Sequence, residues 1–177
     1  MNTTTKTLLG TLSLLSIIAP STQARYIQFM SGDDFGSDYK AQAKQFIEGL
    51  DDLGVPVING TKSNANECDA NNVLGFYSSI HNIMTICTQG VPYWLRFETL
   101  VHETVHVIQD ARDGLDNDNL EPGTVFYVTG LYNRLSDRKT RLILKHYDKE
   151  QWPVEVEAYY FETRPQKVLN ELKRWAF

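Results

Sequence analysis

Two histidines and a glutamate form the most informative short pattern in the chain, His102-Glu103-Thr104-Val105-His106. On an α-helix, residues four apart differ by about 40° around the axis, so the two imidazole rings project on the same side. This spacing allows both rings to bind one zinc ion, with Glu103 close enough to act on a water held by the metal. Because chance produces the pattern in roughly one random chain of this length in a few hundred, we take it as a candidate metal site.

The segment from about Pro92 to Arg112 is predicted to form the helix that carries this motif. A wide apolar arc runs along it, and His102 and His106 fall on the opposite flank. Such a helix packs centrally, so its remaining strip is expected to line a cleft or the surface. The alternative is a pair of surface or core histidines that only form hydrogen bonds. The residues of the arc are Phe97, Leu100, Val101, Val105, Val107, Ile108 and Ala111.

The motif and its helix resemble the zincin metallopeptidases, in which such a helix provides two zinc ligands and the catalytic glutamate. The metzincin branch has Gly and His where this chain has Gln109 and Arg112, which excludes that branch. The gluzincin branch takes its third ligand from a later helix, as a glutamate followed three residues on by a small residue. Residues 155–158, Glu-Val-Glu-Ala, offer this pattern. The resemblance selects Glu155, with Glu157 as the alternative, and since the two point about 200° apart only one can face the metal.

The resemblance also implies the roles of the site residues. Zn²⁺ held by His102, His106 and Glu155 would keep a fourth position for water, and Glu103 would act as the general base in peptide hydrolysis. An oxyanion donor is also needed, and its identity stays open. The candidates are His146, Tyr147 and Tyr159.

Two further features of the family have no clear counterpart in the sequence. Several gluzincins have Asp after the small residue, as a hydrogen-bond partner of a zinc histidine, where this chain has Tyr159. Asp110 is one candidate for that role, and a solvated helix position is the alternative. In zincins an exposed strand edge pairs with the extended substrate, and here a strand within residues 73–87 would serve.

The order of the expected elements predicts an α+β fold. Strand-like segments precede the motif helix and helix-like segments follow it, which is typical of a fold with one small sheet. The expected strands are residues 26–30, 73–77 and 83–87, the last two as a β-hairpin, with an extended segment at 55–58 and a surface loop at 59–72. The expected helices are residues 38–53, 92–112, 124–135, 138–149 and 153–175, and Pro165 should break or kink the last of them.

Residues 1–24 have the layout of a secretory signal peptide. Lys6 provides the positive charge, an apolar stretch runs from Leu8 to Ala19, and a small and polar run ends at Ala24. The alternative is an uncleaved membrane anchor, but the apolar stretch is too short to span a bilayer permanently. We therefore expect cleavage after Ala24, no stable membrane insertion afterwards, and one zincin-like domain at residues 25–177 that is exported to the periplasm or secreted.

Charge and cysteine content indicate the class of partner and the compartment. The net charge of −5 is spread over interspersed acidic and basic residues. No basic stripe or nucleic-acid motif is visible, so the expected partner is a peptide or protein substrate and not a nucleic acid. Cys68 and Cys87 both lie in the exported part and are expected to form a disulfide, with two buried thiols as the alternative.

Two other functions remain open at this point. In the first, a zincin fold binds zinc without catalytic turnover, although structural zinc sites are usually closed by four ligands that include Cys. In the second, the chain is a zinc hydrolase that acts on an amide other than a peptide bond. Peptide deformylase would need a Gly-Cys ligand context, and neither Cys68 nor Cys87 has it.

Overall fold

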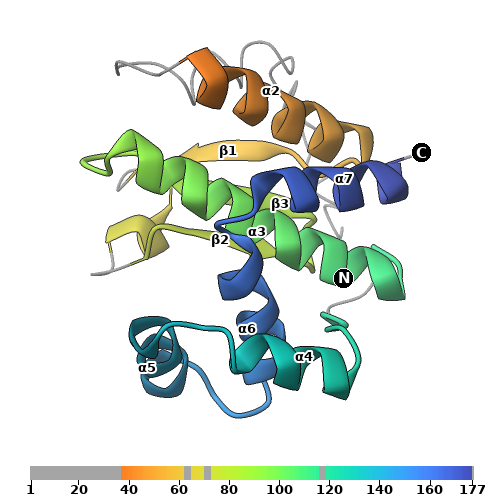
Figure 1. The fold of residues 1–177 in the computed structure, drawn as a ribbon. Coiled ribbons are helices and arrows are strands. Elements are labelled where there is room, and N and C mark those ends of the chain that lie inside the picture. The colour runs from red at the N-terminus through yellow and green to blue at the C-terminus, as the bar shows by residue number, and fades with distance from the viewer. Residues whose placement is uncertain (1–36, 62–64, 70–72, 116–118, 177) are drawn as a thin grey trace, which may run out of the picture.

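Helices dominate the described part of the chain, with a small sheet beside them. The computed structural model describes residues 37–61, 65–69, 73–115 and 119–176. The helices are α2 (Ser37–Asp52), α3 (Tyr93–Asp113), α4 (Val125–Tyr132), α5 (Asp137–His146), α6 (Trp152–Phe161) and α7 (Pro165–Ala176), and the strands are β1 (Val57–Gly60), β2 (Gly75–Ser78) and β3 (Ile83–Cys87) (Figure 1). The predicted α+β class is confirmed. The predicted signal peptide and the strand at residues 26–30 lie outside the described residues.

The sheet has the strand order β1-β3-β2. β2 and β3 form the predicted antiparallel hairpin, in which Tyr77 is opposite Met84. β1 pairs in parallel with β3, with Val57 opposite the same Met84, and this pairing was not predicted. β3 is therefore the central strand, and its side chains from Met84 to Cys87 are buried. β2 lies at an edge of the sheet and packs against α3.

Helix α3 lies at the centre of the molecule, between the sheet and helices α6 and α7 (Figure 1). It follows Pro92 and ends at Gly114, whose φ of 89° lies in the region that glycine adopts without strain. Every side chain from Leu100 to Asp110 is buried. The apolar arc packs into the main core as predicted, but the strip that carries the histidines is covered and does not line the surface. Glu155 and Tyr159 of α6, together with Glu162 directly after it, contact this strip, so that its polar groups have polar partners.

Helix α6 joins two hydrophobic clusters. Ala158 belongs to the main core with α2, α3 and α7, whereas Val156 packs into a second cluster with Leu131 of α4 and Ile143 of α5. In Figure 1, α4 and α5 lie at the bottom and α6 connects them to the rest of the fold. Pro165 starts α7 after a break that follows Phe161, so the predicted interruption at this proline is found.

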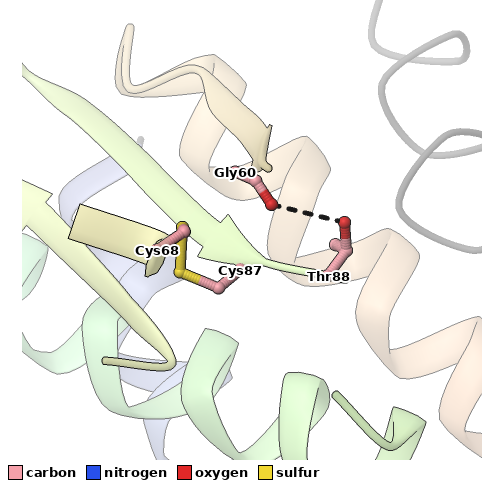
Figure 2. The surroundings of a disulfide bond; sticks show 4 residues. All are labelled: Gly60, Cys68, Cys87 and Thr88. Carbon is pink, nitrogen blue, oxygen red and sulfur yellow. Dashed lines mark hydrogen bonds between the residues drawn. A yellow bond between two sulfur atoms is a disulfide. The ribbon is translucent and has the colours of Figure 1, made fainter. Parts of the chain in front are cut away.

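A disulfide joins Cys68 in the short turn η1 (Asn66–Asp69) to Cys87 at the end of β3, as predicted (Figure 2). Beside it, the carbonyl of Gly60 accepts a hydrogen bond from the hydroxyl of Thr88, at 3.5 Å (Figure 2). The same carbonyl also accepts one from the backbone N–H of Thr88, at 3.1 Å. These contacts attach the segment after β1 to the end of β3. Among the residues that the structure describes, no helix has both the length and the hydrophobicity needed to cross a membrane.

Candidate metal centre

Side chains of α3 and α6 converge on one buried point. His102 Nε2 lies 3.5 Å from Glu155 Oε2, and His106 Nε2 lies 3.4 Å from Glu155 Oε1. The three potential ligand atoms all lie within 4.8 Å of one another, and all three residues are buried. The two histidines face the same way because they are four residues apart on α3. Glu155 faces them from the first turn of α6, which starts with Pro153 near its N-terminus.

The surroundings of Glu155 test whether these residues fit a metal ion. Its Oε2 atom is buried and has no hydrogen bond of good geometry with any described residue, the nearest ion-pair partner being His102 Nε2 at 3.5 Å, which is costly for a carboxylate oxygen. A cation between the three side chains would remove that cost. Burial raises the pKa of Glu155, but His106 and His102 outweigh burial and hold the pKa below its ordinary value. The group could therefore bind a divalent metal ion, and two imidazoles with one carboxylate is a donor set that suits zinc.

His102 is held by a second carboxylate on its other ring nitrogen. Its Nδ1 donates to Glu162 Oε2 over 2.8 Å, and Glu162 Oε1 lies 2.5 Å from Lys139 Nζ of α5. Burial alone lowers the pKa of His102, but its contacts with Glu155 and Glu162 outweigh burial and raise the pKa to about 10 in the metal-free protein. Burial raises the pKa of Glu162, and His102 and Lys139 outweigh it, so that Glu162 is ionised. This arrangement leaves Nε2 of His102 directed at Glu155.

His106 has a different partner on its other ring nitrogen. Its Nδ1 lies 2.7 Å from Oε1 of Gln109, which is fully buried on the same helix. The two candidate zinc histidines therefore contact one charged and one neutral side chain. In both rings the contact occupies Nδ1 and leaves Nε2 facing the common point, which is the arrangement that orients histidine ligands of metals.

The structure places Glu157 away from the two histidines. Its carboxylate receives two parallel hydrogen bonds from Arg112, at 2.8 and 2.9 Å. Gln109 Nε2 and the backbone N–H of Gly123 also donate to Oε2 of Glu157, at 3.0 and 3.2 Å. Of the two glutamates that the sequence offered, Glu155 thus lies with His102 and His106, whereas Glu157 is an anchor between α3, α6 and the segment before α4.

Glu103 lies on the same stretch of α3 as the two histidines. Burial raises its pKa above the ordinary value of a glutamate, against the lowering effect of His102 and His106, and the backbone N–H of Tyr77 donates to its carboxylate. A raised pKa makes a carboxylate a better proton acceptor near neutral pH. The hydrogen bond from Tyr77 also fixes Glu103 beside the edge strand β2.

The three predicted oxyanion donors fall into two groups. The ring of Tyr159 packs edge-on against His102, with ring centroids 4.7 Å apart, and Tyr147 packs edge-on against Tyr159. Burial and the charge of Glu155 raise the pKa of both phenols, to about 12 for Tyr159, on which a hydrogen bond with Tyr147 acts in the opposite direction. His146, in contrast, is exposed at the last residue of α5. Two of the three candidates, both with a hydroxyl group, therefore adjoin the candidate metal centre.

Asp110 does not have the role that the sequence suggested. It is fully buried, so the alternative of a solvated position is also wrong, and it accepts a hydrogen bond of 2.5 Å from the hydroxyl of Tyr77. The contact with the histidine ring is made by Glu162 instead. Tyr77 of the edge strand β2 thus makes two hydrogen bonds to α3. Its hydroxyl donates to Asp110 and its backbone N–H donates to Glu103, and both bonds hold the strand against the helix.

Sequence reasoning missed Glu162, Gln109 and Lys139. Glu162 lies seven residues after Glu155, so on a continuous helix it falls within about 20° of the same face. This spacing of seven residues could therefore have identified Glu162 from the sequence. The family pattern places the acidic partner three residues earlier, where this chain has Tyr159. Gln109 lies three residues after His106, also on the same face of its helix. Lys139 had no local signal, because α5 reaches Glu162 only through the tertiary fold.

Comparisons of the chain with known protein families, with characterised proteins and with solved structures find no match. The case for a metal site is therefore the geometry of these residues.

Proposed function

We propose that this chain is a zinc-dependent peptidase with a zincin-like site of the gluzincin type. The observation that carries the proposal is the buried, unsatisfied oxygen of Glu155, which lies at the point where Nε2 of both motif histidines converges. Structural zinc sites in proteins usually have four protein ligands. Three ligands here, with an acidic side chain next to them, support a catalytic site over a purely structural one.

The roles of the protein groups follow from their positions. His102, His106 and Glu155 would hold the ion. When bound, zinc supplies Lewis acidity, which polarises a substrate carbonyl and lowers the pKa of water towards about 7. Glu103, with a pKa raised by burial, accepts the proton of the attacking water and passes it to the leaving amine.

Tyr147 and Tyr159 are the proposed donors to the oxyanion that forms at the substrate carbonyl. A raised pKa keeps each phenol protonated at neutral pH, so each can donate a hydrogen bond. Tyr147 is preferred, because its hydroxyl also lowers the pKa of Glu155, which places it close to the metal ligands. Tyr159 then orients Tyr147 by packing between it and His102.

The proposed substrate is an extended peptide outside the cell membrane. β2 is an edge strand, and Tyr77 links it to Glu103, so a peptide paired along this edge would pass the proposed base. The disulfide between Cys68 and Cys87 supports an oxidising compartment. Together with the signal peptide expected at residues 1–24, this favours export to the periplasm or secretion.

A pair of variants tests the proposal. Glu103→Gln is expected to keep one zinc per chain but to lose cleavage of a peptide library, whereas His102→Ala is expected to lose both. Glu150→Gln, an exposed glutamate between α5 and α6, is the matched control and should keep both. Full activity of Glu103→Gln would exclude Glu103 as the base. Stoichiometric zinc without cleavage of any peptide would favour a binding protein or a hydrolase for other amides.

A further inference from the structure

The side-chain amide of Gln109 can have only one orientation. One end of the amide lies 3.0 Å from both the carbonyl oxygen of Val154 and Oε2 of Glu157. The carbonyl oxygen can only accept, and Oε2 of Glu157 already accepts hydrogen bonds from Arg112 and from the backbone N–H of Gly123. The two hydrogens of the amide nitrogen are therefore used at this end, and the oxygen of Gln109 must face His106.

This orientation determines the protonation of His106. An amide oxygen only accepts, so Nδ1 of His106 must donate across the 2.7 Å contact. A neutral imidazole has one N–H, and here it is on Nδ1. The lone pair is then on Nε2, the atom that lies 3.4 Å from Glu155. A ring with the opposite tautomer would have to lose a proton from Nε2 before it could bind a metal.

We infer that Gln109 is a positioning residue that presets His106 for metal binding, and that Glu157 and the Val154 carbonyl preset Gln109. The inference deepens the proposed function, on which it rests, by giving Glu157 a role although it is not a ligand. Arg112 and the backbone N–H of Gly123 complete the network by donating hydrogen bonds that hold the side chain of Glu157 in place. His102 needs no such relay, because Glu162 accepts its Nδ1–H directly.

Two substitutions at one position separate this role from simple packing. Gln109→Leu has a similar volume but provides no acceptor for His106. Gln109→Glu retains an acceptor for Nδ1 of His106. The new side chain offers an oxygen to Nδ1 when it is ionised, and also when it is protonated and donates to Val154 or Glu157. Thr104→Val is the matched control, because Thr104 is a fully buried polar residue of α3 that donates only to the Leu100 carbonyl.

The test measures zinc affinity by competition with a chromophoric chelator, and the His106 tautomer by ¹⁵N chemical shifts in the metal-free protein. We expect Gln109→Leu to weaken zinc binding about 10- to 100-fold and to move the proton of neutral His106 to Nε2. Gln109→Glu and Thr104→Val should keep the Nδ1–H tautomer and bind zinc within a few-fold of wild type.

The proposal is overturned if neutral His106 of the wild type carries its proton on Nε2, or if Gln109→Leu keeps both the tautomer and the affinity. The wild-type measurement decides even if Gln109→Leu fails to fold. Failure of the proposed peptidase function would give a different result. The protein would then cleave no peptide, while its zinc affinity and the His106 tautomer would still respond to the substitutions as described.

Discussion

Glu162 accepts a hydrogen bond of 2.8 Å from Nδ1 of His102, across sixty residues of sequence. Glu162 also lies seven residues after Glu155, directly after the end of α6. Helix α6 and the turn that follows it therefore provide both one ligand of the proposed metal, Glu155, and the hydrogen-bond partner of another, His102. Lys139 of α5 completes this arrangement through its ion pair with Glu162. The proposed site is therefore assembled from three helices, and its properties should depend on residues that never touch the metal.

The first prediction concerns Glu162 itself. Glu162→Leu removes the acceptor for Nδ1 of His102 and the nearer of the two carboxylates beside Lys139, so zinc affinity should fall about 10- to 100-fold. Glu162→Gln retains an acceptor oxygen and should lose less. Competition with a chelator measures both variants, with Glu150→Gln as the control. Equal affinity of Glu162→Leu and wild type would show that this contact does not support the ligand.

The second prediction concerns the pH dependence of the metal-free protein. The pKa of His102 is about 10 in the folded protein and 6.5 without its contacts. A raised pKa stabilises the fold fully below about pH 6.5, and this contribution is lost as the pH rises through about 10. Urea titrations should therefore show the free energy of unfolding falling between these two values. Zinc-loaded protein, with His102 unprotonated throughout, should lack this fall, and a flat profile without metal would contradict the assignment.

The third prediction separates neighbouring residues as oxyanion donors. Tyr147→Phe removes one hydroxyl donor and should lower kcat about 10²- to 10³-fold, with KM nearly unchanged, because the oxyanion exists only in the transition state. His146→Ala is the control and should leave both constants unchanged, since His146 is exposed. A larger loss in His146→Ala than in Tyr147→Phe in steady-state peptide cleavage would reverse the assignment.

The fourth prediction concerns the disulfide. Cys68 and Cys87 are 19 residues apart in sequence, and a cross-link of that span stabilises a fold by about 3 kcal/mol in the chain-entropy model. The double variant Cys68→Ala and Cys87→Ala should unfold more easily by about that amount in urea. It should still bind one zinc per chain, because no ligand lies between the two cysteines. Unchanged stability would mean that the loop is already ordered without the bond.

Local patterns predicted most of the fold. The apolar periodicity of α2 and α3, the two short strand-like segments of β2 and β3 on either side of a turn, and the break at Pro165 all have causes within a few residues of sequence. The parallel pairing of β1 with β3 was missed, because β1 is only four residues long and its partner is set by tertiary packing. A four-residue strand contains too little pattern to specify which neighbour it pairs with.

The two candidate histidine ligands were visible in the sequence, but their surroundings were only partly so. His102 and His106 are recognisable because the helix itself sets their separation. The small residue at position 158 already favoured Glu155 over Glu157, but the ion pair with Arg112 that occupies Glu157 could not be predicted from the sequence. The burial of the strip that carries the histidines was also unpredictable, since it depends on Glu162 and on α5, which reach α3 only in the folded chain.

Anomalous diffraction from crystals of the zinc-loaded protein, recorded at the zinc absorption edge, tests the central claim most directly. The account predicts one strong peak about 2.0–2.2 Å from Nε2 of His102, Nε2 of His106 and a carboxylate oxygen of Glu155. A peak bound by other residues, or no peak in protein shown to contain zinc before crystallisation, would contradict it.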